Sequence, residues 1–245
     1  MSSGTLYLIP VALGDSALDV ILPQGVRDIA AQLDTFIVEH PKTARAFLKQ
    51  IVTQTPLQQL TLLVLDEHTP ASELPALLKP LQAGKDVGLI SEAGCPAVAD
   101  PGSNLVRLAH QQGIRVVPLV GPSSILLGLM ASGLSGQRFT FHGYLPVDKA
   151  ERKHKLQDLE QAAQQRDETQ IFIETPYRNR QMLEAIVECC SNDTSLCVAT
   201  DVTLATEMIL TKSVAEWKKH LPEIDKRPSV FLLHAPNASG KTKPR

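Results

Sequence analysis

The chain has 245 residues, of which 43% are hydrophobic, and a formal net charge of −2 at pH 7. This content supports one large domain or two smaller ones and excludes an intrinsically disordered chain as the default. The near-neutral charge excludes a uniformly basic nucleic-acid-binding protein but leaves room for a local basic patch. The sequence shows neither a secretory leader nor an unbroken apolar run of roughly 18 residues, so we expect a cytoplasmic protein without a membrane span.

Strand-like and helix-like patterns alternate along the first half of the chain. Short apolar runs predict strands at Thr5–Val11, Thr35–Val38, Leu60–Leu65, Val87–Ser91 and Arg115–Leu119. Amphipathic periodicity predicts helices at Val26–Leu33, Pro41–Val52, Ala71–Gln82 and Ser103–Gln112. This order is typical of a parallel sheet with helices on both faces. We therefore expect residues 1–119 to form an N-terminal α/β domain.

The pattern changes after residue 119, where links between strands become shorter. Helices are predicted at Ser123–Ala131, Lys149–Gln165 and Tyr177–Cys190. Strands are predicted at Phe139–Gly143, Gln170–Glu174, Leu196–Asp201, Glu207–Thr211 and Ser229–His234. Short links favour antiparallel pairing, so we expect a mixed sheet here. We assign residues 120–237 to a C-terminal α/β domain and residues 238–245 to a frayed tail.

The segment SEAGCPAVADPG, residues 91–102, links a predicted strand to a predicted helix and holds two Gly and two Pro. Such connections usually need only about 2–6 residues. Loops at the carboxyl ends of strands bind ligands in open α/β sheets, and helix N-termini attract anionic groups. A second Gly/Pro loop, Val120–Ser124, follows the next strand. The two loops are expected to form the walls of one ligand cleft, with ordinary surface loops as the alternative.

Several common site motifs are absent from the sequence. It contains no GxGxxG, no GxxxxGK[ST] and no GxSxG, which removes sequence support for dinucleotide, P-loop nucleotide and serine hydrolase sites. The four cysteines, Cys95, Cys189, Cys190 and Cys197, show no CxxC spacing, and the histidines form no HxH or HxxxH pair. We therefore expect neither a metal site nor a disulfide framework.

Seven segments between residues 4 and 236 carry a family likeness: GTLYL, SEAGCPAVADPGSNLV, VVPLVGPSS, ASGLSGQRFTFHGYLP, the helix start Lys149–Leu156, IFIETPYR and ATDVTLATE. In identity, order and spacing they resemble the tetrapyrrole methylase superfamily. The nearest likeness is to its branch of small-subunit ribosomal RNA 2′-O-ribose methyltransferases. The resemblance implies two α/β domains, S-adenosylmethionine (SAM) bound in a cleft between them, methyl transfer as the reaction and a homodimer.

The resemblance also implies which residues meet the cofactor. They are Gly94, Cys95, Pro96 and Asp100 at the methionine part, Pro122, Ser123 and Ser124 on its other side, and Ile173 and Glu174 near the nucleoside. Two segments depart from the branch. A Thr-Pro-Ile-Gly-Asn loop is usual where this chain has Ile9–Asp15, and a Glu-Asp-Thr-Arg run is usual where it has Glu39–Lys42. The cofactor loop thus matches the branch more fully than the substrate-facing segments.

The chemistry of a sulfonium methyl donor defines what else such a site needs. An attacking ribose hydroxyl must be positioned in line and must lose its proton, and no metal is required. Glu39, Glu92 and Asp100 are candidate proton acceptors, and the sequence does not choose among them. For each carboxylate, a capping or solvated role is the alternative.

Basic residues predict a surface for RNA phosphates, with salt-sensitive binding. The substrate-facing set is Glu39, Lys42, Arg138, Lys149, Arg152 and Lys153, with Arg45 and Lys155 beside it. A solvated helix face is the alternative, and an aromatic content of 4% does not indicate base-stacking platforms. Three functions stay open: a SAM-dependent RNA methyltransferase, a SAM-dependent methyltransferase of a small molecule such as a tetrapyrrole or of a protein side chain, and a non-catalytic SAM-binding protein.

Overall fold

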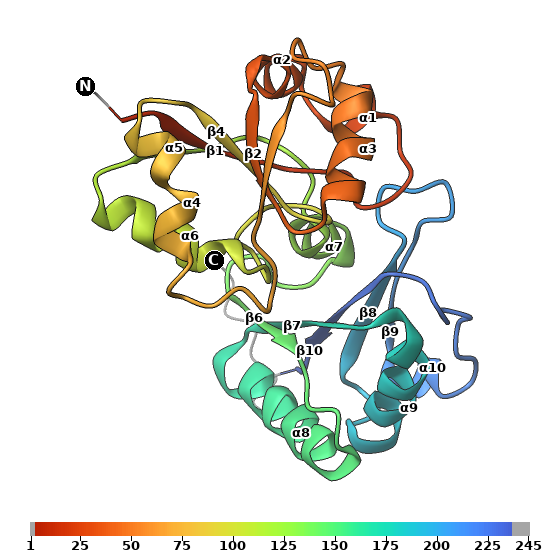
Figure 1. Ribbon diagram of the computed structural model, residues 1–245. Helices are drawn as coiled ribbons and strands as arrows, with labels where there is room; N and C mark the ends of the chain where they lie inside the picture. Colours follow the sequence, from red (N-terminus) through yellow and green to blue (C-terminus); the bar gives the residue numbers. More distant parts are fainter. Residues whose placement is uncertain (1–2, 237–245) are drawn as a thin grey trace. The chain divides into compact units, whose positions relative to one another are not determined.

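The computed structural model describes residues 3–236, so the tail predicted at 238–245 lies outside the described residues. Contacts along the chain divide it into two compact units, with the division between Ser123 and Ser124. Each unit has one five-stranded sheet and its own hydrophobic core (Figure 1). None of the helices that the structure describes is long and apolar enough to span a membrane.

The first unit alternates strands and helices along the chain. Its strands are β1 (Thr5–Ile9), β2 (Thr35–Val38), β3 (Thr61–Val64), β4 (Val87–Ile90) and β5 (Arg115–Pro118). Its helices are α1 (Leu18–Ile21), α2 (Gln24–Gln32), α3 (Pro41–Ile51), α4 (Leu74–Leu77), α5 (Lys79–Gln82) and α6 (Gly102–Gln111). The strands lie in the order β3-β2-β4-β1-β5, and every neighbouring pair is parallel. The predicted parallel sheet is confirmed.

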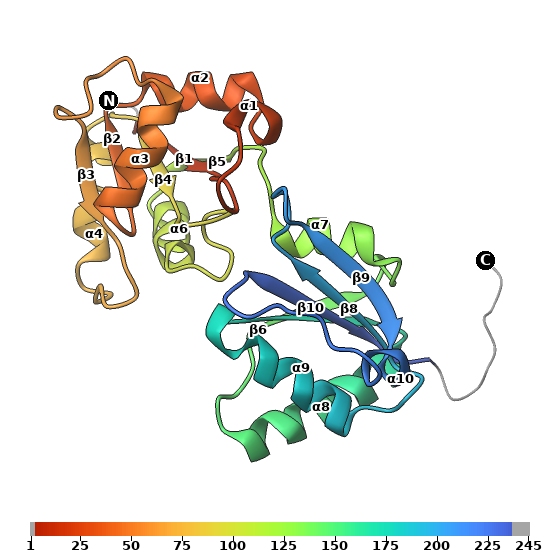
Figure 2. The ribbon, with the colours of Figure 1, turned by 90° about the vertical axis from the view of Figure 1, so that its right-hand side faces the viewer.

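Neighbouring residues of a strand in this sheet enter different cores because side chains alternate between its faces. Phe36 and Val38 of β2 pack with α1, α2 and α3, whereas Ile37 packs with α4, α5 and α6. Helices therefore cover both faces of the sheet (Figure 2). Each large side chain buried in this way contributes about 1.5–3 kcal/mol to folding. The carboxyl ends of all five strands are left at one edge, where the loops gather.

The structure corrects two predicted elements of the first unit. The single helix predicted at Ala71–Gln82 is divided into α4 and α5, because Pro80 has no N–H for a continuous helix and its ring clashes with the preceding turn. The first strand ends at Ile9, before Pro10, and not at Val11. The four-residue helices α1 and α10 (Val214–Trp217) were not predicted.

The second unit begins with a helix and holds a mixed sheet. Its helices are α7 (Ser124–Ser132), α8 (Lys149–Arg166), the 3-10 turn η1 (Pro176–Arg178), α9 (Asn179–Cys189) and α10. Its strands are β6 (Phe139–Tyr144), β7 (Thr169–Glu174), β8 (Ser195–Thr200), β9 (Met208–Ser213) and β10 (Ser229–His234). They lie in the order β6-β7-β10-β8-β9. Only β6 and β7 pair in parallel, which confirms the predicted mixed sheet.

The core of the second unit lies between its sheet and the helices α8, α9 and α10. Phe172 and Phe231 stack there with ring centroids 5.6 Å apart. Trp217 is buried beside them and donates its indole N–H to the carbonyl of Leu196 at 2.9 Å. Helix α7 packs on the sheet through β8, β9 and β10. At its start, α8 is fixed by Asp148, whose carboxylate accepts the backbone N–H groups of the two residues after Lys149.

Candidate active site

The loop after β4 is bonded to the segment after β1. The backbone N–H of Val11 donates to the carbonyl of Gly94 at 2.9 Å, and the N–H of Gly94 donates back to the carbonyl of Val11 at 3.2 Å. Gly94 has a φ of +71°, a left-handed conformation that glycine adopts without steric cost. This pair brings two loops at the carboxyl edge of the sheet together.

Asp100 holds the second half of the same loop. Its Oδ1 accepts the backbone N–H of Gly102 at 2.7 Å and that of Ala97 at 3.1 Å. Ala97 and Ala99 both have positive φ, at 66° and 55°, which costs of order 1–2 kcal/mol for each residue. Asp100 therefore caps a strained turn at the start of α6. The capping role, one of the alternatives left open by the sequence, is the role that the hydrogen bonds support.

The loop after β5 contacts the loops after β1 and β4. Cys95 donates its thiol to the carbonyl of Pro122 at 3.4 Å, which links the two Gly/Pro loops directly. Burial raises the pKa of the Cys95 thiol, so it stays protonated and is a poor nucleophile. Gly121 lies so close to Pro10 that an added Cβ would be 2.3 Å from the Cβ of that proline. Three loops, after β1, β4 and β5, thus pack against one another.

Carboxylates follow the neighbouring strands β2 and β4. Glu92 accepts the hydroxyl of Thr43 at 2.6 Å, and its Oε1 lies 3.5 Å from Nδ1 of His40. The pKa of Glu39 is raised, first by burial and then by repulsion from Asp100 and Glu92. Glu39 therefore binds a proton more readily than an ordinary glutamate. Within residues 3–236, no group of three or more His, Cys, Asp or Glu side chains is arranged to hold a metal ion.

A pocket of about 250 Å³ opens beside this acidic group, between the segment after β1 and helix α3. Leu13 and Phe47 supply apolar walls, and Thr43, Gln50 and Glu92 supply polar atoms. Its volume is below the roughly 300–1,000 Å³ of pockets that enclose a drug-sized ligand. The pocket therefore suits one part of a larger ligand.

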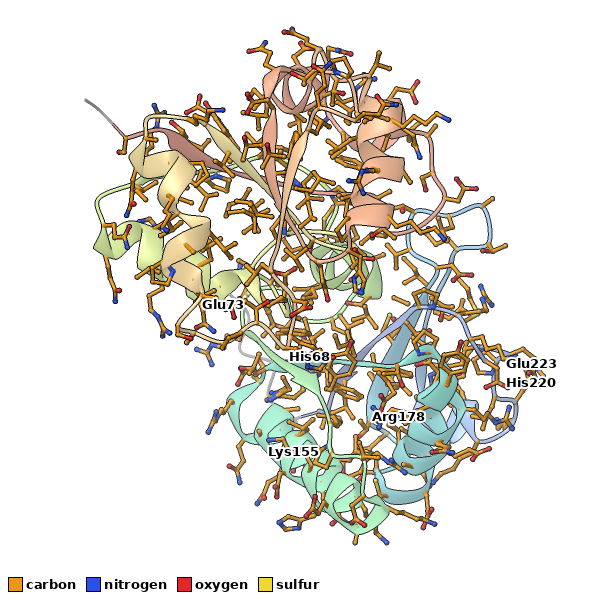
Figure 3. The ribbon with its side chains drawn as sticks, viewed as in Figure 1. His68, Glu73, Lys155, Arg178, His220 and Glu223 are labelled. Atoms are coloured by element: carbon orange, nitrogen blue, oxygen red, sulfur yellow. The ribbon has the colours of Figure 1, made fainter. Side chains whose placement is uncertain are left out.

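In the second unit, Glu174 ends β7 with a side chain that is 0% exposed. Its Oε1 accepts the backbone N–H of Thr175 and the Nη2 of Arg178, both at 2.6 Å. Arg178 lies at the start of α9 (Figure 3). Oε2 of Glu174 has no hydrogen-bond partner among the described residues. A buried acceptor left unpaired costs about 1–3 kcal/mol, which is a reason to expect a ligand donor at this atom.

The remaining residues of the predicted cofactor set lie on the same loops and strand end. Pro96 and Pro122 are buried, while Ser123, Ser124 and Ile173 are partly buried. Ser124 is the first residue of α7. Their role in binding SAM stays a prediction.

The structure changes the interpretation of the basic set at two positions. Arg152 is only 6% exposed and donates from Nη1 to the carbonyl of Val147 at 3.0 Å, so it holds its own loop and is not available to phosphates. Arg138 donates to the carbonyl of Arg166 at 3.1 Å, at the last residue of α8. Since an 18-residue helix is about 27 Å long, Arg138 lies far from Lys149, the first residue of α8.

The other predicted cations are accessible. Lys149 and Lys153 are exposed, and both lie in the first two turns of α8. The Nζ of Lys149 is 3.8 Å from Oε2 of Glu188, an exposed ion pair that contributes little. Lys155 lies on the same helix (Figure 3) and is partly buried. Lys42 is exposed near the start of α3.

The sequence did not predict the side chains that contact Glu92, or the pocket beside Glu92. His40 and Thr43 reach Glu92 because β2 and β4 are neighbours in the sheet, an order that the sequence does not state. The burial of Arg152 did have a signal. It stands at helical spacing from Leu156, Leu159 and Ala163, which form the buried stripe of α8.

Residues 5–217 match the family model of tetrapyrrole (corrin/porphyrin) methylases. The chain belongs to this family. It is accordingly a methyltransferase, which confirms the reaction class implied by the sequence resemblance. The loops after β1, β4 and β5 all lie within the matched residues.

The chain is also similar in sequence to curated relatives and in fold to solved structures. It is 33% identical over 216 residues to "Ribosomal RNA small subunit methyltransferase I" of Pseudomonas aeruginosa, with 88% of this chain and 72% of the relative covered. A protein of the same name from Mesorhizobium japonicum is 34% identical over 222 residues, covering 90% and 71%. The fold is similar to that of the methyltransferase CobJ, with a TM-score of 0.62, 20% identity, and 96% and 95% of the two chains covered. Cobalt precorrin-4 methyltransferase gives a TM-score of 0.59 at 16% identity, with 94% of each chain covered.

Proposed function

We propose that the protein uses SAM to methylate a ribose 2′-hydroxyl of small-subunit ribosomal RNA. The observation that carries this proposal is the identity of 33% to a ribosomal RNA methyltransferase across 88% of the chain. The same segments that match the family include the carboxyl-edge loops of the first unit. An enzyme with this substrate works where ribosomes are assembled, in the cytoplasm.

The residues of the carboxyl-edge loops fit SAM in charge. When bound, SAM supplies a methyl group that its positive sulfonium makes electrophilic. Glu39 and Glu92 provide negative charge at this edge, which complements the sulfonium and the ammonium group of the methionine part. The free oxygen of Glu174 suits a donor on the nucleoside. The residues that would hold SAM are Gly94, Cys95, Pro96, Asp100, Pro122, Ser123, Ser124, Ile173 and Glu174.

The carboxylates Glu39, Glu92 and Asp100 repel the anionic parts of any acceptor, whether these are the phosphates of RNA or the carboxylates of a tetrapyrrole. Only a neutral group, such as the hydroxyl of a ribose, approaches them without that penalty. The phosphates of an RNA substrate need cations elsewhere, and Lys149 and Lys153 of the second unit are exposed for that role.

Glu39 is the residue that we assign as proton acceptor for the ribose hydroxyl. Its raised pKa makes it a stronger base than an ordinary carboxylate. Asp100 is already engaged by two backbone N–H groups and Glu92 by Thr43. Glu39→Gln should therefore lower kcat by about 10²–10⁴-fold while the Kd for SAM, measured by calorimetry, changes little.

Glu67→Gln is the matched control for that variant. Glu67 follows β3 at the same edge of the sheet, its side chain is 79% exposed, and it forms an ion pair with the neighbouring His68. Among the charges that raise the pKa of Glu39, it has the smallest effect. Methyl transfer should be retained in this control. Full activity of Glu39→Gln would show that Glu39 is not the proton acceptor. That result would not contradict the proposed substrate.

The substrate is tested by following labelled methyl groups from SAM into total cellular RNA, protein and small-molecule fractions. We expect label in RNA, and one ribose methyl group missing from small-subunit ribosomal RNA of cells that lack the protein. Label in the protein or small-molecule fraction, together with unchanged ribose methylation of ribosomal RNA in those cells, would show that the acceptor is not ribosomal RNA. Saturable SAM binding without transfer to any fraction would indicate a non-catalytic SAM-binding protein.

We infer that the protein is a homodimer that uses α7. This helix has no charged residue, and Leu126 and Met130, one turn apart on one side, are 52% and 79% exposed. Burying such side chains in a second copy stabilises the association. Sedimentation equilibrium should give a dimer for the wild type and a shift toward monomer for Met130→Glu. A monomeric wild type at micromolar concentration would refute this assembly.

A further inference from the structure

Two of the three tyrosines of the chain are exposed at neighbouring strand ends of the second unit. Tyr144, the last residue of β6, is 57% exposed, and Tyr177, in the turn η1 just after β7, is 78% exposed. Large aromatic side chains contribute most to folding when they are buried, and neither of these does so. Their exposure therefore calls for a reason other than the core.

Both tyrosines emerge at the same edge of the sheet. β6 and β7 are parallel neighbours, and Tyr144 is paired in register with Ile173, four residues before Tyr177. The carboxyl ends of parallel strands meet at one edge, which is where ligands bind in such sheets. The second unit thus presents two exposed rings on adjacent strand ends.

The backbone of β6 is irregular just before Tyr144. Its register with β7 shifts between Phe141 and Tyr144, and Gly143 between them has a φ of +67°. Irregularities of this kind bend a strand and re-aim the side chain that follows, and they are common beside active sites. Nothing lies within 4 Å of a Cβ built at Gly143, so the glycine is there for its conformation and not for lack of space.

Cations accompany the two rings. Helix α8 begins five residues after Tyr144, at Lys149, and Lys153 lies one turn further on the same side. Both lysines are exposed. Arg178 directly follows Tyr177 and is 25% exposed in its side chain. Aromatic rings beside cations are the combination by which proteins bind single-stranded nucleic acid: bases stack on the rings, and phosphates pair with the cations.

We propose that Tyr144 and Tyr177 form a stacking platform for unpaired bases of the RNA substrate, with Lys149 and Lys153 contacting the adjacent phosphates. The proposal rests on the proposed RNA methyltransferase function and adds the form of the RNA: the segment bound here is single-stranded. Bases within a duplex are stacked on each other and cannot lie on a protein ring. The platform therefore selects a loop or an unpaired stretch.

The test measures binding of a fluorescently labelled single-stranded RNA oligonucleotide of mixed sequence to the full chain at several salt concentrations. Tyr144→Ala and Tyr177→Ala should each weaken binding about 5- to 100-fold, because one stacked base is lost. Their log–log salt slope should stay at the wild-type value, since stacking releases no counterions. Lys149→Ala should instead lower that slope by about one unit.

Three comparisons control for misfolding and for the cofactor. Tyr144→Phe and Tyr177→Phe retain the ring and should retain RNA affinity. Phe139→Ala removes a ring that is 41% exposed at the opposite end of β6 and should leave affinity unchanged. The wild type should bind the single strand more tightly than the same oligonucleotide annealed to its complement.

The outcomes separate the platform from the proposed function. If the wild type binds and methylates RNA but the alanine variants behave like Phe139→Ala, the platform is refuted and the function stands. If the alanine variants lose SAM affinity and not RNA affinity, the rings serve the cofactor and the platform is refuted. If the wild type transfers methyl groups only to proteins or small molecules, the function on which the platform rests is itself refuted.

Discussion

In the first unit, carboxylates follow the parallel strands β2 and β4, whereas in the second unit exposed tyrosines and then cations follow the parallel pair β6 and β7. Glu39 follows β2 and Glu92 follows β4, and the pKa of Glu39 is raised first by burial and then by repulsion from Asp100 and Glu92. Tyr144 ends β6 and Tyr177 follows β7, with Lys149 at the start of the next helix. Both edges use the same arrangement, in which neighbouring parallel strands deliver consecutive loops to one place.

This difference shows that the sheet determines where the loops lie, whereas a few residues after each strand determine which chemical groups are presented there. The acidic edge suits a positively charged donor group, and the aromatic and basic edge suits bases and phosphates. The units also differ in how they hold their charges. Both units have exposed ion pairs, and the second unit also has the pair of Arg178 with the buried Glu174.

The largest effect is expected from Arg178→Met in the second unit. The substitution leaves Glu174, with its side chain 0% exposed, without its charged partner. Breaking a buried ion pair on one side should lower the free energy of unfolding by about 3 kcal/mol. Trp217 is the only tryptophan of the chain and is 1% exposed, so its fluorescence in urea reports the second unit directly.

Two further variants sharpen that result. Adding Glu174→Gln to Arg178→Met should restore part of the stability, because the uncompensated buried charge is then gone. In the first unit, Lys85→Met breaks an ion pair with Asp34 whose side chains are 60% and 49% exposed, and it should cost less than about 1 kcal/mol. Equal losses for Arg178→Met and Lys85→Met would contradict the contrast between the units.

The next effect concerns two glycines, one in each unit. Gly121→Ala should destabilise the first unit by about 1–3 kcal/mol, because its Cβ would lie 2.3 Å from the Cβ of Pro10. At Gly143 an added Cβ meets open space, and only the φ of +67° opposes it. Gly143→Ala should therefore destabilise the second unit by about 1 kcal/mol. Amide hydrogen exchange measures the loss of stability in each unit separately. A larger loss for Gly143→Ala than for Gly121→Ala would show that conformation outweighs packing at these sites.

The smallest effect is the pH dependence contributed by Glu39. Because its pKa in the folded state lies above the ordinary value of 4.5, the folded chain holds this proton more tightly than the unfolded chain. The stability it contributes is therefore present at low pH and is lost as the pH rises through the folded-state pKa. At neutral pH, Glu39→Gln should raise the free energy of unfolding by less than about 1 kcal/mol, after solvent screening.

Urea titrations of wild type and Glu39→Gln at neutral pH and at successively lower pH measure this difference. The two proteins should become closer in stability as the pH falls through the folded-state pKa, because Glu39 then takes up its proton in the wild type. A variant that is less stable than wild type at neutral pH would mean that the carboxylate is held by attraction and not opposed by its neighbours.

Most of the strands could be predicted from the sequence because short apolar runs bounded by Gly, Pro or charged residues leave little freedom of assignment. β2 and β10 have the predicted bounds. The prediction failed where local rules competed: helical periodicity across 71–82 suggested one helix, and Pro80 divides it. Helices of four residues, such as α1, carry too few turns to show a period.

The candidate site was predictable in its loops and less so in its side chains. Gly and Pro spacing located the loops that Cys95 and Pro122 bring into contact. The role of Asp100 as a cap depends on backbone N–H groups whose direction only the folded turn defines. The exposure of Tyr144 and Tyr177 depends on the pairing of β6 with β7, which an aromatic content averaged over the chain does not reveal.

The place of β10 in the second sheet has a consequence for biosynthesis. β10 is central, between β7 and β8, yet it follows every other strand that the structure describes. On the ribosome, the first unit has all five strands once Pro118 has emerged, whereas the second cannot close its sheet until His234 does. At about 5–20 residues per second this interval lasts roughly 6–23 s. In the last part of this interval, after Glu174 has emerged, the nascent chain exposes Phe172 and the unpaired edge of β7, a surface that a chaperone can recognise.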